Sequence, residues 1–349
     1  MNNLFSLSSI AGTRTSLVRR FAIAGLCALA AALTCFALSG CSGSSADSAN
    51  NTDSKDTKKV QVSASFYPMY DFAQKIGGDR VEVSCLVPAG TEPHDWEPST
   101  TDIAKLSNAD VLVYNGAGME HWIDDTLASL SSSHLVAVEA SKGVTLRELS
   151  EEADEHEHAH EEHAEGNHDD HDHDHSGTDP HVWLNPQNAK IEMGNIRDAL
   201  IQADPDGADV YRANYDKWAA ECDTLDNEFK TGLANVAQRS IVVSHEAFGY
   251  LCDAYNLTQM PIEGIEADSE PDAKEMAEIA EFVKEHNVKT IFSEELVSPK
   301  VAQAIAQETG AQTAELNPVE GLTDEQLAAG EDYFSTMRDN LTALKEALS

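Results

Sequence analysis

Nine of the 14 histidines in this sequence fall within 26 consecutive residues. Eight lie in "HEHAHEEHAEGNHDDHDHDH", within a segment from Glu151 to His175 that carries 12 acidic residues and no Lys or Arg. The ninth, His181, stands alone in "DPHVWLNP". Imidazole nitrogen is a common ligand of zinc and other transition metals, so both stretches could bind metal. A flexible acidic run loses conformational entropy when it wraps an ion, so its affinity per ion should be the lower of the two.

Two other isolated histidines follow predicted strands. His94 lies at the centre of the Pro- and Gly-containing loop "PAGTEPHDWEPS", and His245 lies in "VVSHEAF", where a buried strand meets a helix. In open α/β sheets, ligands bind beyond the carboxyl ends of the strands. The ordinary alternatives are a surface histidine at 94, a loop histidine packed on Trp183 at 181, and a capping or core histidine at 245.

Three carboxylates occupy similar positions after strands: Glu294 and Glu295 in "FSEEL", and Glu320 in "ELNPVEGLT". Composition alone does not choose among them. Zinc prefers four ligands in a tetrahedron, so isolated histidines with one carboxylate indicate a metal held between two lobes. The stretch "HEAFG" lacks the second histidine of the zinc-protease signature HExxH, which excludes that class here.

The elements that must position these residues alternate between strand and helix, which predicts parallel sheets covered by helices. Strands are expected at residues 60–66, 81–87, 110–116, 239–245, 288–295 and 311–318. Helices are expected at residues 67–78, 99–109, 186–203, 205–236, 246–255, 271–287, 298–310 and 332–348.

The segment 205–236 is expected to be one helix of roughly 30 residues, about 45 Å long at 1.5 Å per residue. Its bulky side chains recur every three or four positions, which places them on one face. They are Tyr211, Tyr215, Trp218, Cys222, Leu225, Phe229, Leu233 and Val236. We therefore predict two doubly wound α/β lobes, residues 60–204 and 237–349, joined by this helix, with the histidine-rich loop at 151–175 inside the first.

Bulk composition narrows the class of protein. The 349 residues suffice for two domains, and the net charge of −38 makes a nucleic-acid partner improbable on electrostatic grounds. There is no CxxC pair, and therefore no sign of a thiolate zinc site. After the N-terminal segment, Cys85, Cys222 and Cys252 remain, an odd number, so at least one is free or pairs between molecules.

The N-terminus has the pattern of a secretory signal peptide. Arg14, Arg19 and Arg20 precede an apolar run at residues 21–38, and small residues lead to Cys41 in "LSGC". A permanent membrane anchor is the alternative. The stretch "LSGC" resembles a bacterial lipoprotein signal, which implies that residues 1–40 are removed and Cys41 is lipidated. Residues 41–59 are polar and are expected to form a flexible tether.

From about Val60 to its end, the chain resembles the zinc/manganese-type metal-binding lipoproteins of bacterial ABC importers, and within them the zinc-uptake substrate-binding proteins. The resemblance rests on the order and spacing of "PAGTEPHDWEPS", "DPHVWLNP", "SHEAFGYL", "FSEELVSPK" and "LNPVEGLT". The family fold is two α/β lobes bridged by a long rigid helix.

The resemblance implies metal ligands at His94, His181 and His245, with Glu320 as the fourth; some zinc members close the site with water or another carboxylate. Manganese-type members carry a carboxylate where His245 stands, and nitrogen in place of oxygen favours zinc. Secondary, weaker metal sites are expected in the histidine-rich loop, unless it is an inert solvated insertion. Its histidines are His156, His158, His160, His163, His168, His171, His173 and His175.

The implied function is that of a high-affinity zinc receptor, lipid-anchored on the outer face of the cytoplasmic membrane, monomeric and without catalysis, which delivers Zn²⁺ to an ABC permease. Within this class, manganese or iron remains an alternative cargo. A zinc hydrolase would need an open metal position and a general base, for which Glu246 is the obvious candidate. An adhesin is the other alternative, although no stretch of the sequence marks such a surface.

Overall fold

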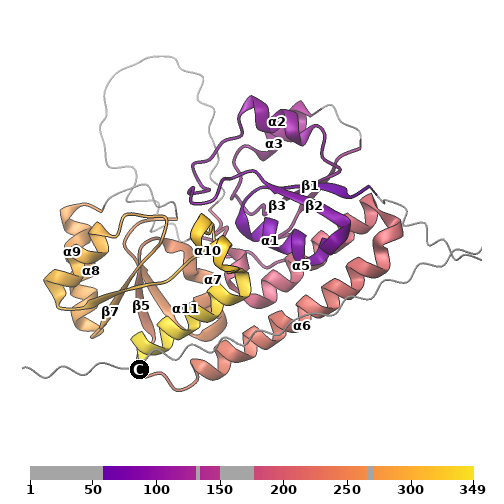
Figure 1. Ribbon diagram of the computed structural model, residues 1–349. Helices are drawn as coiled ribbons and strands as arrows, with labels where there is room; N and C mark the ends of the chain where they lie inside the picture. Colours follow the sequence, from indigo (N-terminus) through magenta and orange to yellow (C-terminus); the bar gives the residue numbers. More distant parts are fainter. Residues whose placement is uncertain (1–57, 131–133, 150–176, 266–270) are drawn as a thin grey trace, which may run out of the picture. The chain divides into compact units, whose positions relative to one another are not determined.

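The computed structural model describes residues 58–130, 134–149, 177–265 and 271–349. The signal segment, nearly all of the tether and the eight clustered histidines therefore lie outside the described residues. Residues 55–349 belong to one compact unit. Within it, two sheets of four parallel strands each form the centre of one lobe (Figure 1).

The first sheet has the strand order β2-β1-β3-β4. Its central strands are buried on both faces, and Val62 pairs with Val83 on one side and Val111 on the other. This explains why the sequence of β3, "VLVY", is continuously apolar rather than alternating. The strands are β1 (Val60–Ala64), β2 (Val81–Cys85), β3 (Val111–Tyr114) and β4 (Val136–Glu139).

The second sheet repeats this connectivity, with the order β6-β5-β7-β8. Val242 at the centre of β5 is fully buried and lies opposite Ile291 of β7. The strands are β5 (Ser240–Val243), β6 (Thr258–Pro261), β7 (Thr290–Ser293) and β8 (Gln312–Glu315). The predicted fold class, two parallel α/β lobes, is confirmed.

Helices cover both sheets and connect the lobes. The first lobe contains α1 (Tyr67–Gly77), α2 (Thr100–Leu106), α3 (Ile123–Ser129) and α5 (Pro186–Ala203). The second contains α7 (Gly249–Tyr255), α8 (Ala273–Glu285), α9 (Lys300–Thr309), α10 (Asp324–Ala329) and α11 (Tyr333–Leu348). Short 3₁₀ turns lie at Gly78–Arg80, Val182–Leu184, Pro205–Gly207 and Glu246–Phe248.

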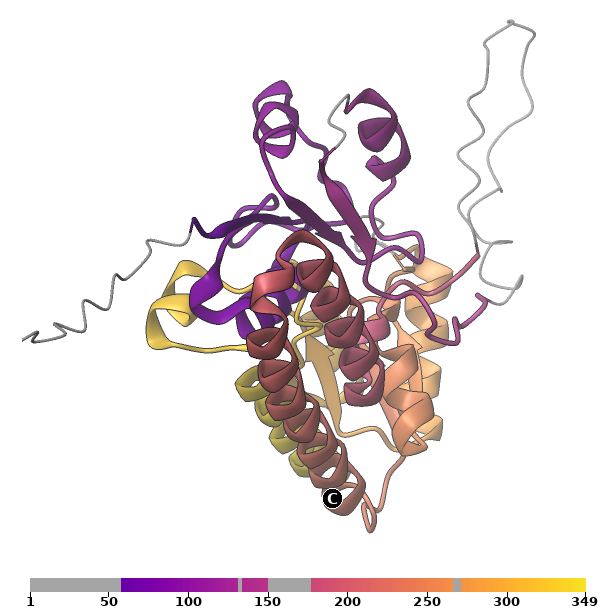
Figure 2. The same ribbon diagram turned by 90° about the vertical axis from the view of Figure 1, so that its right-hand side faces the viewer.

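The connecting helix α6 (Ala208–Gly232) runs alongside α5 and α11 (Figure 2). It has 25 residues, so the prediction of roughly 30 was too long. Pro205–Gly207 form a 3₁₀ turn, and Gly232 is the last helical residue, so the apolar stripe continues past the helix into Leu233 and Val236. The periodicity therefore identifies the buried face of the helix correctly but overestimates the length of the helix.

Four elements have no counterpart in the sequence-based prediction: α3, α10, β4 and β6. Both strands lie at an edge of their sheet and are only partly buried. The sequence of β6, "TQMP", is polar and ends in proline, which an edge position tolerates. β6 thus lacks the apolar signal of a central strand.

One hydrophobic core runs through both lobes, with Trp183 at their junction. The Trp183 ring is fully buried and meets Phe66 of the first lobe edge to face, with ring centroids 5.0 Å apart. Its indole N–H donates to the Pro318 carbonyl at 2.7 Å, and its own carbonyl accepts from the Tyr333 hydroxyl at 2.7 Å. Both partners belong to the second lobe, so the lobes meet through packed side chains.

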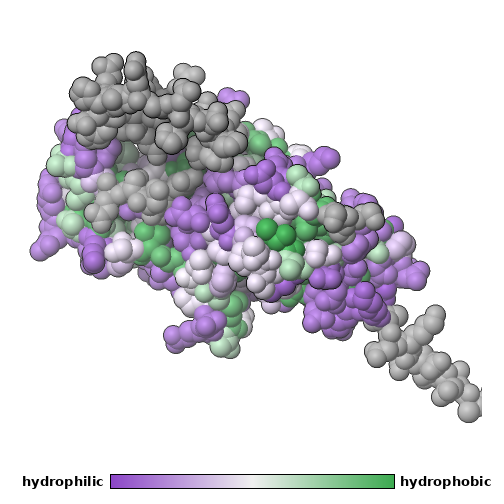
Figure 3. Space-filling model, turned by 90° about the horizontal axis from the view of Figure 1, so that it is seen from above, coloured by the Kyte–Doolittle hydropathy of each residue, from purple (hydrophilic) through white to green (hydrophobic). Residues whose placement is uncertain are grey.

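The described surface in Figure 3 is mostly hydrophilic, with small separate hydrophobic patches. None of the described helices has the length and apolar character that a membrane crossing requires. All three described cysteines, Cys85, Cys222 and Cys252, are free thiols.

Candidate metal centre

Four side chains converge from four loops, each of which follows a strand. His94 lies between β2 and α2, His181 precedes the turn Val182–Leu184, His245 directly follows β5, and Glu320 follows β8. All four are buried, with at most 7% of any residue exposed. The structure therefore brings together the three histidines that the sequence singled out, and of the three candidate carboxylates it selects Glu320.

Five of the six distances among the four potential ligand atoms are close to the edges of a small tetrahedron. His181 Nε2 lies 3.2 Å from His94 Nε2 and 3.3 Å from His245 Nε2. Glu320 Oε1 lies 3.0 Å from His181 Nε2, 3.2 Å from His245 Nε2 and 3.5 Å from His94 Nε2. A regular tetrahedron with metal–ligand bonds of about 2.0–2.1 Å has edges of about 3.3–3.4 Å. These five distances suit a zinc-sized ion, and all four atoms lie within 4.8 Å of one another.

Asp179 contacts His181 at Nδ1, the ring nitrogen that faces away from the cluster. Its Oδ1 lies 2.9 Å from His181 Nδ1 and also accepts the backbone N–H of His181 at 2.9 Å. When Nδ1 donates to this carboxylate, the Nε2 lone pair is directed toward the site. Asn115, at the end of β3, fixes the same segment by donating to the Pro180 carbonyl at 3.0 Å.

Glu294 holds His245 in the same way. Its Oε2 lies 2.7 Å from His245 Nδ1, and its Oε1 accepts the His245 backbone N–H at 3.1 Å. Glu294 follows β7, the strand that pairs with β5, so adjacent strand ends supply the ligand and its support. The other candidate, Glu295, instead accepts from Asn317 Nδ2 at 2.9 Å.

His94 is held differently. Its backbone N–H donates to Glu92 Oε1 at 3.0 Å, within the same irregular segment. Among the described residues, none is hydrogen-bonded to its Nδ1. The orientation of this ring therefore depends on packing, with ring centroids 5.1 Å from His181 and 6.0 Å from His245.

The turn that carries Glu320 contains a strained residue. Val319 is fully buried and has φ of 61°, in the left-handed region that β-branched residues rarely adopt. Such a conformation costs about 1–3 kcal/mol and persists where neighbours fix it. Asn317 does so by accepting the Val319 N–H at 2.7 Å and by pairing with Asn340. The turn aims the Glu320 carboxylate at the three imidazoles.

The electrostatics of the cluster favour opposite charges on its members. Burial alone lowers the pKa of His181 and His245, but Asp179 and Glu320 outweigh it for His181, and Glu294 and Glu320 for His245. The pKa of His181 is raised, and that of His245 is raised well above its usual value. Burial alone would raise the pKa of Glu320, but the histidines lower it well below the usual range. These shifts favour a negative charge on Glu320 and positive charges on His181 and His245, so a bound cation competes with protons at those two imidazoles.

Sequence reasoning missed the two supporting carboxylates, Asp179 and Glu294, in these roles. Asp179 precedes His181 by two residues in "TDPH", and Glu294 was considered only as a direct ligand. Among the described residues, His94, His181, His245 and Glu320 form the one group of three or more potential metal ligands within reach of a single ion.

Comparison with known proteins agrees with this geometry. Residues 62–347 match the family model described as "Zinc-uptake complex component A periplasmic". The chain is 43% identical over 290 residues to the high-affinity zinc uptake system protein ZnuA of Bacillus subtilis, covering 83% of this chain and 88% of that protein. It is 36% identical over 289 residues to the zinc-binding lipoprotein AdcA of Streptococcus pneumoniae, covering 82% of this chain but only 56% of that longer protein.

Among solved structures, the Zn(II)-bound ZnuA-like domain of Streptococcus pneumoniae AdcA aligns with a TM-score of 0.69 and 34% identity. The alignment covers 83% of this chain and 99% of that domain. The family model spans both lobes and all four converging side chains. The chain therefore belongs to the family of periplasmic zinc-uptake component A proteins.

Proposed function

We propose that this protein is a high-affinity extracytoplasmic receptor for Zn²⁺ that delivers the ion to an ABC permease for uptake. The observation that carries the proposal is the buried tetrahedral cluster of three imidazole nitrogens and one carboxylate oxygen. Its support from relatives is that the Bacillus protein is named for high-affinity zinc uptake and the Streptococcus domain is zinc-bound.

The ligands of the proposed site are His94, His181, His245 and Glu320. Three neutral imidazoles with one carboxylate suit zinc, whereas manganese prefers more oxygen ligands. We therefore propose zinc as the preferred cargo over manganese or iron.

The proposed role is binding without catalysis. A catalytic zinc keeps one coordination position for water, whereas Glu320 Oε1 supplies the fourth ligand atom here. Glu246, the candidate base for a hydrolase, is partly buried, and burial raises its pKa. The cluster thus resembles a closed transport site more than a hydrolytic one.

We propose that residues 1–40 are a lipoprotein signal peptide and that Cys41 carries the lipid. Residues 41–59 then tether a monomeric body of two lobes. The lobes are residues 60–204 and 237–349, and residues 205–236 connect them. The name of the Streptococcus relative, a zinc-binding lipoprotein, supports the anchor. Cys41→Ala should release the protein from the membrane fraction. Continued incorporation of labelled fatty acid into the variant would refute the assignment of Cys41.

We further propose that the eight histidines between residues 156 and 175 bind additional zinc more weakly and raise its local concentration near the receptor. A flexible segment must lose conformational entropy when it wraps an ion, whereas the preorganised cluster of His94, His181, His245 and Glu320 does not.

Competition titration of the purified protein tests the main proposal. With chromophoric chelators, one zinc ion per molecule should bind tightly and Mn²⁺ much more weakly. His245→Asp should narrow the difference between the two metals, because an oxygen ligand suits the harder ion. Equal or tighter binding of manganese by the unmodified protein would overturn the assignment of zinc.

A further inference from the structure

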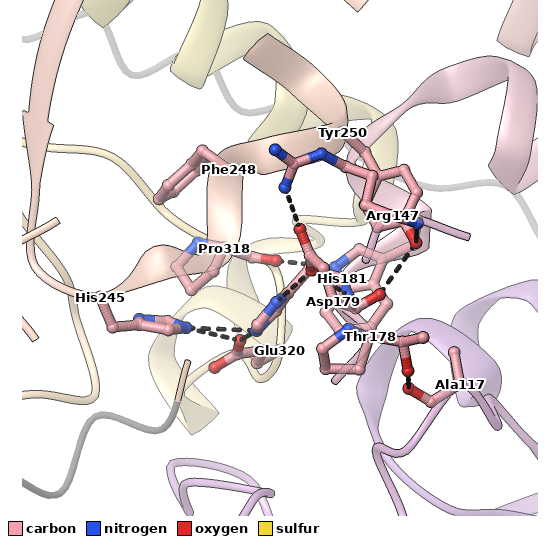
Figure 4. A network of polar contacts seen from close by, with 12 residues as sticks. Ala117, Arg147, Thr178, Asp179, His181, His245, Phe248, Tyr250, Pro318 and Glu320 are labelled. Carbon is pink, nitrogen blue, oxygen red and sulfur yellow. Dashed lines mark hydrogen bonds and ion pairs between the residues drawn. The ribbon is translucent and has the colours of Figure 1, made fainter. Parts of the chain in front are cut away.

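Arg147 lies one step behind the metal site. Its Nη1 donates to Asp179 Oδ2 at 2.7 Å, while Asp179 Oδ1 contacts His181 Nδ1 (Figure 4). The Asp179 side chain is fully buried, and that of Arg147 is 29% exposed. A continuous polar chain thus runs from a partly exposed guanidinium through a buried carboxylate to a metal-site imidazole.

The same arginine also contacts the other lobe. Its backbone N–H donates to the Tyr250 hydroxyl at 2.9 Å, and that hydroxyl donates to the Asp179 carbonyl at 2.9 Å. Its Nε donates to Asp253 Oδ2 at 2.8 Å. Both Tyr250 and Asp253 belong to α7, immediately after His245. Arg147 and Asp179 therefore join the segment that carries His181 to the helix that follows His245.

Gly249, the first residue of α7, leaves the space that this arrangement needs. A Cβ at position 249 would lie 1.7 Å from Arg147 Nη1 and 2.5 Å from Asp179 Oδ2. The backbone of Gly249 is ordinary right-handed helix, with φ of −57° and ψ of −51°. The glycine is thus required by the close approach of the ion pair and not by its own conformation.

We propose that Arg147 is a positioning residue of the metal site, which holds Asp179 against His181 and couples the orientation of that ligand to the contact between the lobes. The inference rests on the proposed function, because it assigns Arg147 a part in retaining the bound ion. Separating α7 from Arg147 would remove the Tyr250 hydroxyl from Arg147 and from the Asp179 carbonyl, and Asp253 from the guanidinium, and so loosen the hold on Asp179 at the same time as it moves His245 away from His181. Loosening of the lobe contact and weakening of the His181 ligand would then be one event.

The test compares three variants of the full-length protein. Arg147→Ala removes the guanidinium, and Gly249→Ala keeps every polar group but forces apart the Arg147–Asp179 pair, since the added Cβ would meet both Arg147 Nη1 and Asp179 Oδ2. The second variant covers the case in which the first folds poorly. Asp253→Ala is the matched control, because it removes only the ion pair to a carboxylate that is 65% exposed, where such pairs contribute little. Arg147→Lys, which retains the charge but has a single donor nitrogen in place of the guanidinium fork, tests partial rescue.

Two readouts are needed: the rate at which a chelator removes Zn²⁺, and the visible absorption of Co²⁺ bound in place of zinc, which reports ligand geometry. Mutating outer-shell partners of metal ligands typically costs about 10- to 100-fold in affinity. We expect Arg147→Ala and Gly249→Ala to release zinc about tenfold faster and to alter the cobalt spectrum. Arg147→Lys should give an intermediate rate, and Asp253→Ala should change the rate less than about twofold.

If folded Arg147→Ala and Gly249→Ala both retain the unmodified rate and spectrum, Arg147 has no positioning role. If faster release comes with an unchanged cobalt spectrum, the effect is a general loosening, and the coupling to His181 is refuted. Failure of the proposed function is distinguishable, because the unmodified protein itself would then lack one tight zinc site.

Discussion

His245 and His94 each supply an imidazole nitrogen to the proposed site, yet the protein holds them in different ways. His245 directly follows a buried strand, and both its Nδ1 and its backbone N–H contact Glu294 of the neighbouring strand. His94 lies in a long irregular segment and makes its backbone contact to Glu92, two residues away. The first histidine is fixed by the sheet and the second by its own loop.

The chemical identity of a metal ligand and its preorganisation are therefore separate properties of the site. A ligand whose ring is fixed before binding loses little freedom when the ion arrives, whereas a loop-borne ligand must be ordered. We therefore expect the lobe that contributes His245 to contribute more of the affinity, although each lobe supplies two ligands.

Removal of each histidine gives the largest expected effect. Apparent zinc-binding free energies of structural sites are about 10–16 kcal/mol, so one ligand of four accounts for about 3 kcal/mol, or roughly a hundredfold. His245→Ala should cost at least that factor, because it also leaves Glu294 buried without its partner. His94→Ala should cost about tenfold, because water can replace a ligand on a loop more easily. Competition titration measures both.

Both variants must first show unmodified circular dichroism. Equal losses for the two variants would contradict the distinction between a sheet-borne and a loop-borne ligand. A folded His245→Ala protein with unmodified zinc affinity would overturn the assignment of the site itself.

The adjacent carboxylates Glu294 and Glu295 form a matched pair for mutation, because only Glu294 contacts His245. Glu294→Gln should weaken zinc binding about 10- to 100-fold, because the amide supports the His245 tautomer less well. Glu295→Gln should change affinity less than about twofold, since its contact to Asn317 survives with an amide oxygen. The two values, measured by the same titration, should differ by at least about fivefold; if they do not, the support of His245 by Glu294 contributes nothing measurable.

Zinc affinity and the stability of the metal-free protein should depend on pH in different ways. His181 and His245 have raised pKa values, so protons compete with zinc at pH values above the usual 6.5 of histidine, and affinity should rise with pH through that region. Zinc binding should release protons into a weakly buffered solution, with fewer released as pH increases. A flat affinity between pH 6 and about 8 would contradict these shifts.

Without metal the trend in stability is opposite. Because the pKa of His245 is raised in the folded protein, its protonation adds to the free energy of unfolding. This contribution is fully present below about pH 6.5 and is lost as pH rises through the pKa of the folded protein. Because the pKa of Glu320 is lowered in the folded protein, its ionisation also adds to the free energy of unfolding. This contribution is fully present above about pH 4.5 and is lost only in stronger acid. The contribution of the cluster to the free energy of unfolding of metal-free protein should therefore be largest between about 4.5 and 6.5, which thermal denaturation at several pH values can check.

Deleting residues 151–175 should have the smallest effect on the tight site. The two ends of this segment adjoin, because Leu149 N–H donates to the Gly177 carbonyl and Glu148 bridges Thr178 in antiparallel fashion. With Ser150→Asn and Ser176→Gly, a two-residue hairpin turn can close the gap. Fewer zinc ions should bind in total, while the tight site changes less than about twofold. Loss of the tight site in calorimetry would show that the clustered histidines contribute to it.

The sequence predicted the central strands, most helices and the three histidine positions, because each depends on a local pattern. Val60–Ala64 is recognisable by its alternation and Ser240–Val243 by its apolar run, and His245 by its place just after the second strand. The edge strand β6 carries no such run, whereas β4, "VAVE", has a short one that the prediction did not use.

The support of the ligands could not be predicted, because it depends on contacts between distant segments. Glu294 meets His245 across 49 positions, and Arg147 meets Asp179 across 32. Nor could residue types alone separate Glu320 from Glu294 and Glu295; the resemblance to a family made that choice, and the strained turn at Val319 is its structural basis.

The three free thiols have a consequence for chemistry outside the cytoplasm. Burial raises the pKa of Cys85 and of Cys222 to about 12 and raises that of Cys252 as well. Oxidation, disulfide exchange and metal capture all proceed through the thiolate, which is then scarce at neutral pH. These cysteines behave as small hydrophobic residues. A zinc carrier built this way can contain sulfur in an oxidising compartment without losing its thiols to disulfides or diverting its cargo from the imidazole site.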